Sequence, residues 1–311
     1  MCAALSLNIN YPKTFAMKKL MMALAVALIL PSCTKDEPAD KKVSPVVNIY
    51  IPNDTIEHHA TVTFGCNYWS VSHTAMTRAT LQSLNLTDLW VFDLMDGQSS
   101  PTLLIHQTNE DSDFGMPTVT AEYGLHMFYF VASRGESPTV SNTTVSWSKP
   151  SDTFWQSLCL TIAPSTTTTH AVSLDRVVSR LRITVTDEVP EGLSVLSITP
   201  SHWYYGLDYT TGESCDDRQT ARSVNVPASY VGTSGQLVAS FFCLSSPDEW
   251  LTDITLKATA SDNSTLSQIS ISDVPMQRNH ITAFSGTLFG AGRAISVSAD
   301  DEWGSDIIGT W

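Results

Sequence analysis

Apolar and polar residues alternate with a period of two along most of the chain after residue 45. In the segment ATVTFGCNYW (residues 60–69) the apolar side chains share one face, and threonine and asparagine occupy the other. The segments RLRITV (180–185) and ITLKATA (254–260) alternate in the same way. Because successive side chains of a strand point to opposite faces, this pattern predicts strands with one buried and one solvated face.

Two further segments, LWVFDL (89–94) and LHMFYFV (125–131), are apolar on both faces, which predicts central strands. No stretch after residue 45 keeps an apolar period of 3.6 over ten residues, so long helices are not expected. Turn-forming pairs separate the strand segments, as short strands in a sheet require. These pairs are Asp96-Gly97, Arg134-Gly135, Glu191-Gly192 and Thr211-Gly212.

Many short strands separated by turns are typical of β-sandwiches, and the length after the leader fits two of them. The run of strands that closes with HAVSL is followed by DRVVSRLRITVTD, which opens a new run with clean alternation. The boundary is therefore placed near Asp175. The sequence predicts an all-β protein with two tandem β-sandwich domains, residues 46–174 and residues 175–311.

The N-terminal region has the features of an export signal. Lys18 and Lys19 precede an uninterrupted apolar run from Leu20 to Leu30. In a helix that run covers roughly 16 Å, about half of a bilayer core, so it predicts a secretory signal rather than a membrane span. Residues 1–32 are expected to be leader and signal peptide, with Met17 as the start of translation.

The signal ends in Leu30-Pro31-Ser32-Cys33, which resembles a bacterial lipobox apart from its proline. The resemblance implies cleavage between Ser32 and Cys33 and acylation of Cys33; an ordinary signal peptide with a chance cysteine is the alternative. Residues 33–45 form a polar tether whose acidic start resembles the export signal of surface lipoproteins. A surface-exposed lipoprotein of the outer membrane is therefore expected, anchored through its N-terminal lipid.

Composition narrows the functional classes. Acidic residues outnumber basic ones, 31 to 17, and the formal net charge is −14. This charge argues against binding to the phosphate backbone of nucleic acids. Only 15% of the residues are charged, whereas helix surfaces are usually rich in Lys, Glu and Arg, so a mostly helical fold is not expected.

Motifs for enzymatic chemistry are missing from the sequence, which indicates a protein that is not an enzyme. There is no HExxH, GxSxG, P-loop or CxxC motif, and GAGRAI (290–295) lacks the third glycine of a dinucleotide loop. DSDFG (111–115) lacks the remaining oxygen ligands of a calcium loop. No cofactor and no metal are expected. Four cysteines follow Cys33, and we expect mostly buried free thiols rather than a disulfide framework.

The lipobox leader, the segments LTDLWVFDLMDGQ and LDRVVSRLRITVTDEVP, and the later NHITAFSGTLFG and ISVSADDEW resemble the fimbrillin superfamily of type V pili. The likeness is a patchwork of strand motifs over most of residues 46–303. It implies two transthyretin-like β-sandwiches on a lipidated N-terminus. It also implies a subunit of a surface fimbrium that mediates adhesion, with the anchor or minor-subunit branch fitting best and other fimbrial subunits as partners.

In that family, subunits join by β-strand addition: an Arg-specific protease releases the first strand, and a neighbour's C-terminal strand replaces it. The alternating Ile295, Val297 and Ala299 could form such a donor strand, or simply the last strand of the second domain. The apolar residues of the tail extend the candidate: Ile307, Ile308 and Trp311. Arg78 is a candidate processing site, with an exposed polar loop as the alternative reading.

A surface glycan-binding lipoprotein is the second functional hypothesis. Trp203, Tyr204 and Tyr205 are adjacent aromatic residues whose rings could stack on sugars of host or bacterial surface glycans. The simpler explanation is that these rings pack across strands, because aromatic residues are common in sheets.

Overall fold

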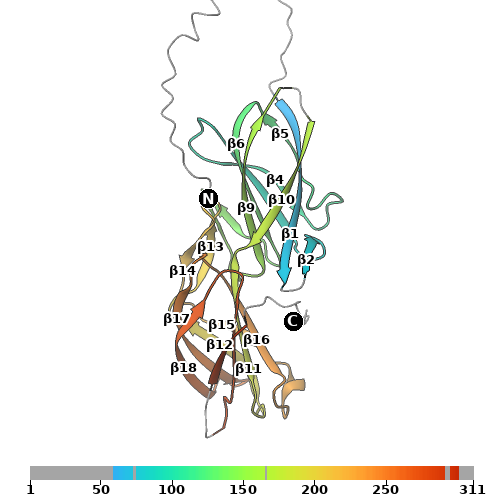
Figure 1. The fold of residues 1–311 in the computed structure, drawn as a ribbon. Coiled ribbons are helices and arrows are strands. Elements are labelled where there is room, and N and C mark those ends of the chain that lie inside the picture. The colour runs from blue at the N-terminus through green and yellow to red at the C-terminus, as the bar shows by residue number, and fades with distance from the viewer. Residues whose placement is uncertain (1–58, 73–74, 165–166, 291–294, 301–311) are drawn as a thin grey trace, which may run out of the picture. The chain divides into compact units, whose positions relative to one another are not determined.

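The computed structural model describes residues 59–72, 75–164, 167–290 and 295–300, and it confirms the all-β prediction (Figure 1). Within these residues the chain forms twenty strands and one short 3-10 turn, η1 (Ala228–Tyr230). None of the described residues belongs to a helix long and apolar enough to cross a bilayer. The strands form two lobes, each built around its own hydrophobic core.

The first lobe contains one eight-stranded sheet with the order β2-β1-β10-β9-β6-β3-β4, to which β5 is added by pairing with β1. Its strands are β1 (His59–Ser72), β2 (Ala75–Thr80), β3 (Asp88–Met95), β4 (Thr102–Thr108), β5 (Thr118–Glu122), β6 (Gly124–Ser133), β9 (Thr153–Ile162) and β10 (Thr167–Arg176). As predicted, the segments that are apolar on both faces lie inside the sheet: β6 is flanked by β9 and β3, and β3 by β6 and β4.

This sheet curls so that β1 faces β6 across the first core. The ring of Phe64 on β1 lies 4.9 Å from that of Phe128 and 5.0 Å from that of Phe130, both on β6. Val62 and Phe64 are fully buried, as the alternation of the segment predicted. The curl makes a sandwich of one continuous sheet.

The second lobe packs two sheets against each other. The larger has the order β20-β19-β11-β16-β13-β8-β7, with β14 beside β13, and the smaller has the order β15-β12-β17-β18. The larger sheet consists of β7 (Thr139–Ser141), β8 (Thr144–Ser146), β11 (Val178–Val185), β13 (Tyr204–Asp208), β14 (Glu213–Asp217), β16 (Leu237–Leu244), β19 (Ile281–Gly286) and β20 (Ile295–Asp300). The smaller sheet consists of β12 (Leu193–Pro200), β15 (Arg222–Asn225), β17 (Trp250–Ala260) and β18 (Thr265–Met276).

Two features join the lobes. The first is a spine, β10 followed by β11, in which only Val177 separates the last strand of the first lobe from the second lobe. The second is the β7–β8 hairpin, which leaves the first lobe between β6 and β9 and pairs with β13 of the second lobe. The predicted division at residue 175 would therefore separate this hairpin from the sheet to which it belongs.

A third cluster of buried residues lies between the lobes and is rich in aromatic rings. Tyr209 stacks on Phe92 with ring centroids 3.9 Å apart, and its hydroxyl donates a hydrogen bond of 2.7 Å to the carbonyl of Asn142. The indole of Trp155 donates a hydrogen bond of 2.7 Å to the carbonyl of Tyr209. Chain connection and side-chain packing thus both hold the lobes together.

Candidate functional site

Strand β1 pairs with the spine and closes one side of the first core. It pairs in parallel with β10, from Thr61 opposite Thr167 to Tyr68 opposite Leu174. Its inward side chains are buried in the first core: Ala60, Val62, Phe64, Cys66 and Tyr68. Removing β1 would leave the backbone of β10 unpaired beside an exposed apolar core, which is the kind of edge that accepts another strand.

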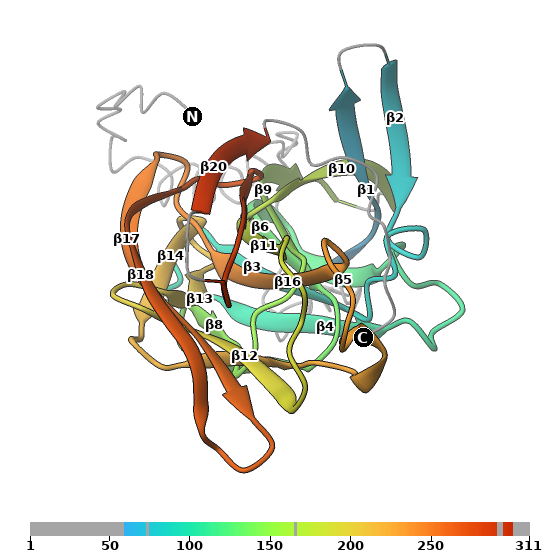
Figure 2. The same ribbon diagram turned by 90° about the horizontal axis from the view of Figure 1, so that it is seen from below.

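The candidate processing residue Arg78 lies in β2, where its backbone pairs with Trp69 of β1. Among the described strands β2 pairs with β1 alone, and Figure 2 shows it at the periphery of the ribbon. A cut at Arg78 would break the covalent link between β1 and the rest of the lobe. The structure places Arg78 in a paired strand and not in the loop of the alternative reading, and its cleavage stays a prediction.

The donor-strand candidates Ile295, Val297 and Ala299 lie in β20, the end strand of the larger sheet of the second lobe. Strand β20 pairs antiparallel with β19, and these three residues stand opposite Gly286, Phe284 and Thr282. In this structure β20 is therefore a strand of its own lobe. The tail candidates Ile307, Ile308 and Trp311 lie outside the described residues, as do Ser32 and Cys33.

A carboxylate clamp holds the chain just ahead of β20. Both oxygens of Asp187 accept hydrogen bonds from backbone amides: Leu288 at 2.9 Å, Phe289 at 2.6 Å and Gly290 at 3.0 Å. Burial raises the pKa of this carboxyl, but the three amide hydrogen bonds outweigh burial and leave the pKa below its usual value. The clamp fixes the backbone of residues 288–290, after β19.

A buried ion pair marks the junction of the lobes. The guanidinium of Arg176, at the end of β10, donates hydrogen bonds of 2.7 and 3.1 Å to the two oxygens of Asp152, and both side chains are buried. The Cζ atom of Arg176 lies 5.2 Å from the ring centroid of Tyr68 on β1 and 4.8 Å from that of Phe154. A further hydrogen bond of 3.4 Å reaches Asn279 of the second lobe. Arg176 thus contacts β1, the spine and the second lobe at once.

Arg176 was not among the residues predicted to matter. The sequence gives one signal for it, an arginine at an inward position of a strand, two residues after the buried Leu174. A buried charge requires a partner, and Asp152 is far enough away in sequence that spacing alone does not identify it.

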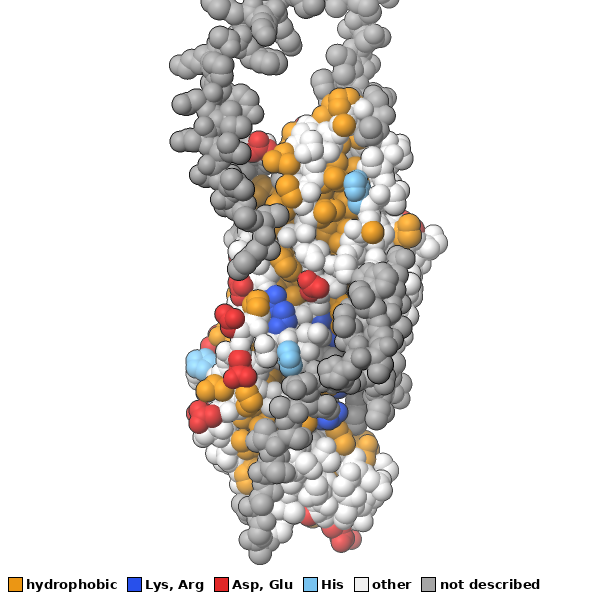
Figure 3. Space-filling view, in the orientation of Figure 1, with side chains coloured by type: hydrophobic (Ala, Val, Ile, Leu, Met, Phe, Trp, Pro, Cys, Tyr) orange, Lys and Arg blue, Asp and Glu red, His pale blue; other side chains and the backbone are white. Residues whose placement is uncertain are grey.

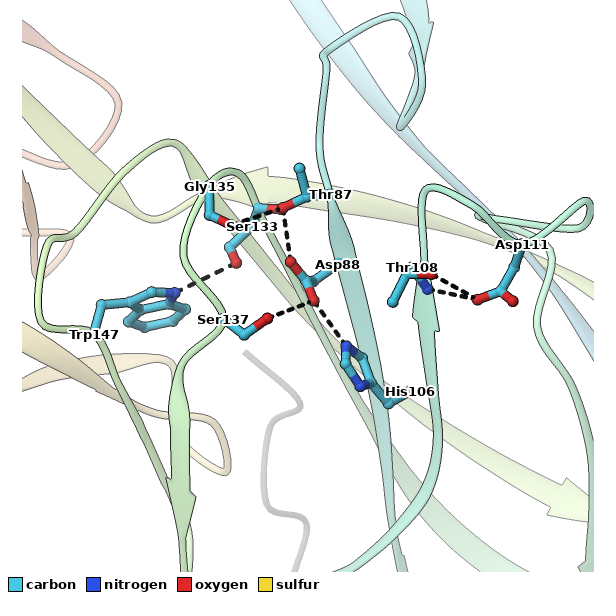
Figure 4. A network of polar contacts seen from close by, with 9 residues as sticks. All are labelled: Thr87, Asp88, His106, Thr108, Asp111, Ser133, Gly135, Ser137 and Trp147. Atoms are coloured by element: carbon cyan, nitrogen blue, oxygen red, sulfur yellow. Dashed lines mark hydrogen bonds and ion pairs between the residues drawn. The ribbon is translucent and has the colours of Figure 1, made fainter.

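A second polar network, drawn in Figure 4, is centred on the buried carboxylate of Asp88. It accepts hydrogen bonds from Thr87 (2.7 Å) and Ser137 (3.1 Å) and contacts Nε2 of His106 at 2.8 Å. Close by, the indole of Trp147 donates a 3.4 Å hydrogen bond to the hydroxyl of Ser133. The network therefore ties the approach to the β7–β8 hairpin to the first sheet.

The second histidine–aspartate pair, His126 and Asp93, is buried. Nδ1 of His126 lies 2.9 Å from both oxygens of Asp93, and Nε2 lies 2.9 Å from the carbonyl of Glu122. Both ring nitrogens are thus engaged within the fold. No group of three or more histidine, cysteine, aspartate or glutamate side chains suited to a metal ion occurs among the described residues.

Burial argues against the sugar-stacking site considered for Trp203, Tyr204 and Tyr205. Trp203 and Tyr205 are 0% and 2% exposed and belong to the core of the second lobe, so their rings are not available to a sugar. The indole of Trp203 donates a 3.0 Å hydrogen bond to the carbonyl of Phe242. Tyr204 is half-buried and packs edge-on against Trp250. Cross-strand packing, the simpler explanation, accounts for all three rings.

All four described cysteines are free thiols, as expected. Cys66 and Cys243 are buried, and burial raises the pKa of each thiol to about 12. Cys159 is exposed on β9, whereas Cys215 is half-buried. The two buried thiols are protonated at neutral pH and act as small apolar side chains.

Several solved structures are similar to this chain. The fimbrial anchor protein Mfa2 of Porphyromonas gingivalis is 10% identical, with a TM-score of 0.44 over 79% of this chain and 100% of that one. The tip fimbrial protein Mfa3 of the same organism is 11% identical, with a TM-score of 0.43 over 78% and 100%. A candidate adhesin of Bacteroides ovatus is 10% identical, with a TM-score of 0.47 over 78% and 88%.

A comparison with curated proteins finds no match. Residues 139–310, more than half of the chain, match the model of a family described as a family of unknown function. The chain belongs to this family, DUF6562.

Proposed function

We propose that this protein is a surface fimbrial subunit that acts as the membrane anchor or a minor component in cell adhesion. It joins other subunits by β-strand addition and is held in the outer membrane by acylated Cys33. The observation that carries the proposal is β1: a strand that completes a core, is joined onward through a peripheral β2, and lies between the predicted lipidation residue Cys33 and the candidate processing residue Arg78.

Strand addition suits these elements for a physical reason. A sheet edge presents unpaired amide and carbonyl groups, and an incoming strand satisfies them while its alternate side chains fill an apolar groove. With β1 in place the first core is closed, which suits an anchor that keeps its first strand. The end position of β20 suits a strand that can be offered to a neighbour.

The assembly claim is tested by isolating the intact protein from cells in gentle detergent. Co-purification of a pilus shaft subunit is expected, and it should be lost when residues 295–311 are deleted. A matched control, Thr259→Ser on β17, changes one hydroxyl side chain away from both chain ends and should leave co-purification intact. Recovery of monomer alone from wild-type cells would refute the assembly claim.

The lipid claim is tested separately, by mass spectrometry of the mature N-terminus. An acylated Cys33 is expected, and Cys33→Ala should release the protein from the membrane fraction. A mature protein that starts with a free amine at another residue would refute acylation without bearing on assembly.

A further inference from the structure

A buried histidine–aspartate pair joins strands β3, β5 and β6 of the first lobe. His126 on β6 and Asp93 on β3 are only 2% and 6% exposed. Nδ1 of His126 lies 2.9 Å from both oxygens of Asp93, and its Nε2 lies 2.9 Å from the carbonyl oxygen of Glu122, the last residue of β5. Each ring nitrogen therefore faces an oxygen atom.

The hydrogen-bond geometry sets the number of protons on the pair. A backbone carbonyl only accepts hydrogen bonds, so Nε2 has to carry a hydrogen. A neutral imidazole then leaves Nδ1 as an acceptor, which cannot bond to an ionised carboxylate. The contacts at Nδ1 are satisfied when one further proton is present, either on Nδ1 or on Asp93. In both cases the pair holds one proton more than a neutral histidine beside an ionised aspartate, and it carries no net charge.

The surroundings of the pair favour keeping this proton. Burial raises the pKa of the Asp93 carboxyl and outweighs the hydrogen bond from His126, and the nearby charge of Glu122 raises that pKa further. Loss of the proton would leave an unbalanced negative charge in a buried place, which is costly.

The groups around His126 come from three strands and from its own. Strand β3 contributes the carboxylate of Asp93, β5 ends in Glu122, and β9 places the apolar Leu160 opposite the histidine. On β6 the imidazole stacks on the ring of Phe128, with centroids 5.4 Å apart. On the face drawn in Figure 3, charged side chains are sparse over the first lobe and gather toward the second. A change of protonation in this part of the lobe is therefore centred on the pair.

Two sets of contacts lead from the pair to β1. Strand β5 pairs antiparallel with the first five residues of β1, starting with Glu122 opposite His59. The ring of Phe128, stacked on His126, lies 4.9 Å from the ring of Phe64 on β1. A change at His126 thus reaches the start of β1 through the backbone of β5, and the buried side of β1 through Phe128.

We propose that the proton shared by His126 and Asp93 is a pH-dependent latch that holds β5 and the start of β1 in the first lobe. While the proton is bound, the carbonyl of Glu122 stays hydrogen-bonded to the histidine and β5 stays aligned with β1. The latch acts within one molecule and does not depend on assembly with other subunits.

The direction of the pH effect follows from the state that opens. When β5 and β6 separate locally, the histidine and the aspartate become solvated. A solvated histidine loses its proton above about pH 6.5, and a solvated aspartate is already ionised there. Above this pH the open form has released the proton that the closed form holds, so each further pH unit favours opening by up to about tenfold. Rising pH therefore loosens the start of β1.

Hydrogen exchange of the full-length protein between pH 6.5 and pH 8.5 tests the latch. After correction for the intrinsic effect of pH on exchange, the protection of amides in residues 59–63 and 118–122 should fall severalfold per pH unit, and at most about tenfold. Protection in β12 and β17 of the second lobe should stay level, which controls for loosening of the whole molecule. Constant protection of β1 and β5 over this range would overturn the proposal.

The variant Asp93→Asn separates the proton from the shape of the pair. An asparagine amide can donate to Nδ1 of a neutral histidine while Nε2 still donates to Glu122, so the latch closes without the extra proton. Protection of β1 and β5 in this variant should not change with pH. His170→Gln, at a half-buried histidine on β10 of the same lobe, is the matched control and should keep the wild-type dependence. Equal pH dependence in Asp93→Asn and wild type would overturn the proposal.

Nitrogen-15 NMR of the histidine rings gives an independent readout on the wild-type protein, and His126→Phe assigns the signals by their loss. At pH 6.5, Nε2 of His126 should carry a hydrogen, and Nδ1 should either carry one or accept one from Asp93. A ring whose only hydrogen lies on Nδ1 would overturn the proposal, because Glu122 would then receive no hydrogen bond.

Discussion

The two lobes place the same arrangement of strands on the two halves of the spine. In the first lobe the order is β2-β1-β10, and in the second it is β20-β19-β11. In each, a strand pairs in parallel with the spine and carries an antiparallel strand on its outer side. Strands β1 and β19 therefore occupy equivalent places in different lobes, as do β2 and β20.

The difference lies in how these strands are connected. Strand β19 follows β18 and continues into β20, so it is held on both sides by its own lobe. Strand β1 is joined to the described lobe only through β2. One cut after β1 can release a strand on which the core of the first lobe depends. The core of the second lobe is closed by β19, which other strands of the same lobe precede and follow in the sequence.

The largest expected effect comes from truncating the buried phenylalanine of each parallel strand. Phe64→Ala on β1 and Phe284→Ala on β19 should each lower the free energy of unfolding by about 3–5 kcal/mol, because each ring is almost fully buried. Chemical denaturation followed by circular dichroism and tryptophan fluorescence measures this. Thr61→Ala, on the exposed face of β1, is the control and should change stability by less than about 0.5 kcal/mol.

This pair also tests the coupling of the lobes. Because the aromatic junction and the β7–β8 hairpin join them, both variants should shift one common transition. Two transitions, with each variant shifting only its own, would show that the lobes unfold independently.

A smaller effect is expected at the junction itself. Asp152→Asn leaves the buried guanidinium of Arg176 without its opposite charge and should cost roughly 3 kcal/mol. A double variant, Asp152→Asn with Arg176→Met, should recover part of the loss, since the unpaired charge is gone. Melting temperatures of the two single and the double variant form the cycle; strict additivity would contradict a direct interaction.

The contact between the Gly212 turn and Trp155 should come next. A Cβ at Gly212, whose φ is +77°, would lie 2.7 Å from the ring of Trp155. Gly212→Ala should therefore destabilise by about 2–3 kcal/mol, through backbone strain and overpacking. Gly97→Ala is the matched control, because its φ is +88° but nothing lies within 4 Å of the added carbon. Equal melting temperatures for the two variants would argue against close packing at the junction.

The smallest effect is expected at Asp187, and it depends on pH. Because amide hydrogen bonds lower the pKa of this carboxyl in the folded protein, its contribution is present above the unfolded pKa and is lost as pH falls through the folded value. Asp187→Asn should cost at most about 1 kcal/mol at neutral pH, since the group is largely solvated. Denaturation from pH 7 to pH 3 should show the difference from wild type shrinking; a constant difference would refute the carboxylate's role.

The sequence predicted the strands well because each strand's pattern is local. Alternation located β11 and β17. The segments 89–94 and 125–131 are apolar on both faces, and this located the interior strands β3 and β6. The glycines of the four predicted turns all have positive φ angles. Asn67 is an exception: it was assigned to the solvated face of β1 but is 2% exposed.

Pairing between distant strands could not be predicted from these local patterns. Nothing in TVSNTTVS (139–146) indicates a partner beyond Asp175, because alternation reports a strand's faces and not its neighbour. The family match also begins at Thr139, the first residue of β7, so its unit includes this hairpin. The Arg176–Asp152 pair escaped prediction for the same reason.

The spine has a mechanical consequence for the two lobes that it joins. Tension applied between the start of β1 and the end of β19 would act along β1, β10 and β11, parallel to their length. The inter-strand hydrogen bonds, which cross this direction, would then be loaded in shear and resist together instead of opening one after another. A chain built this way should withstand pulling far better along the spine than across it.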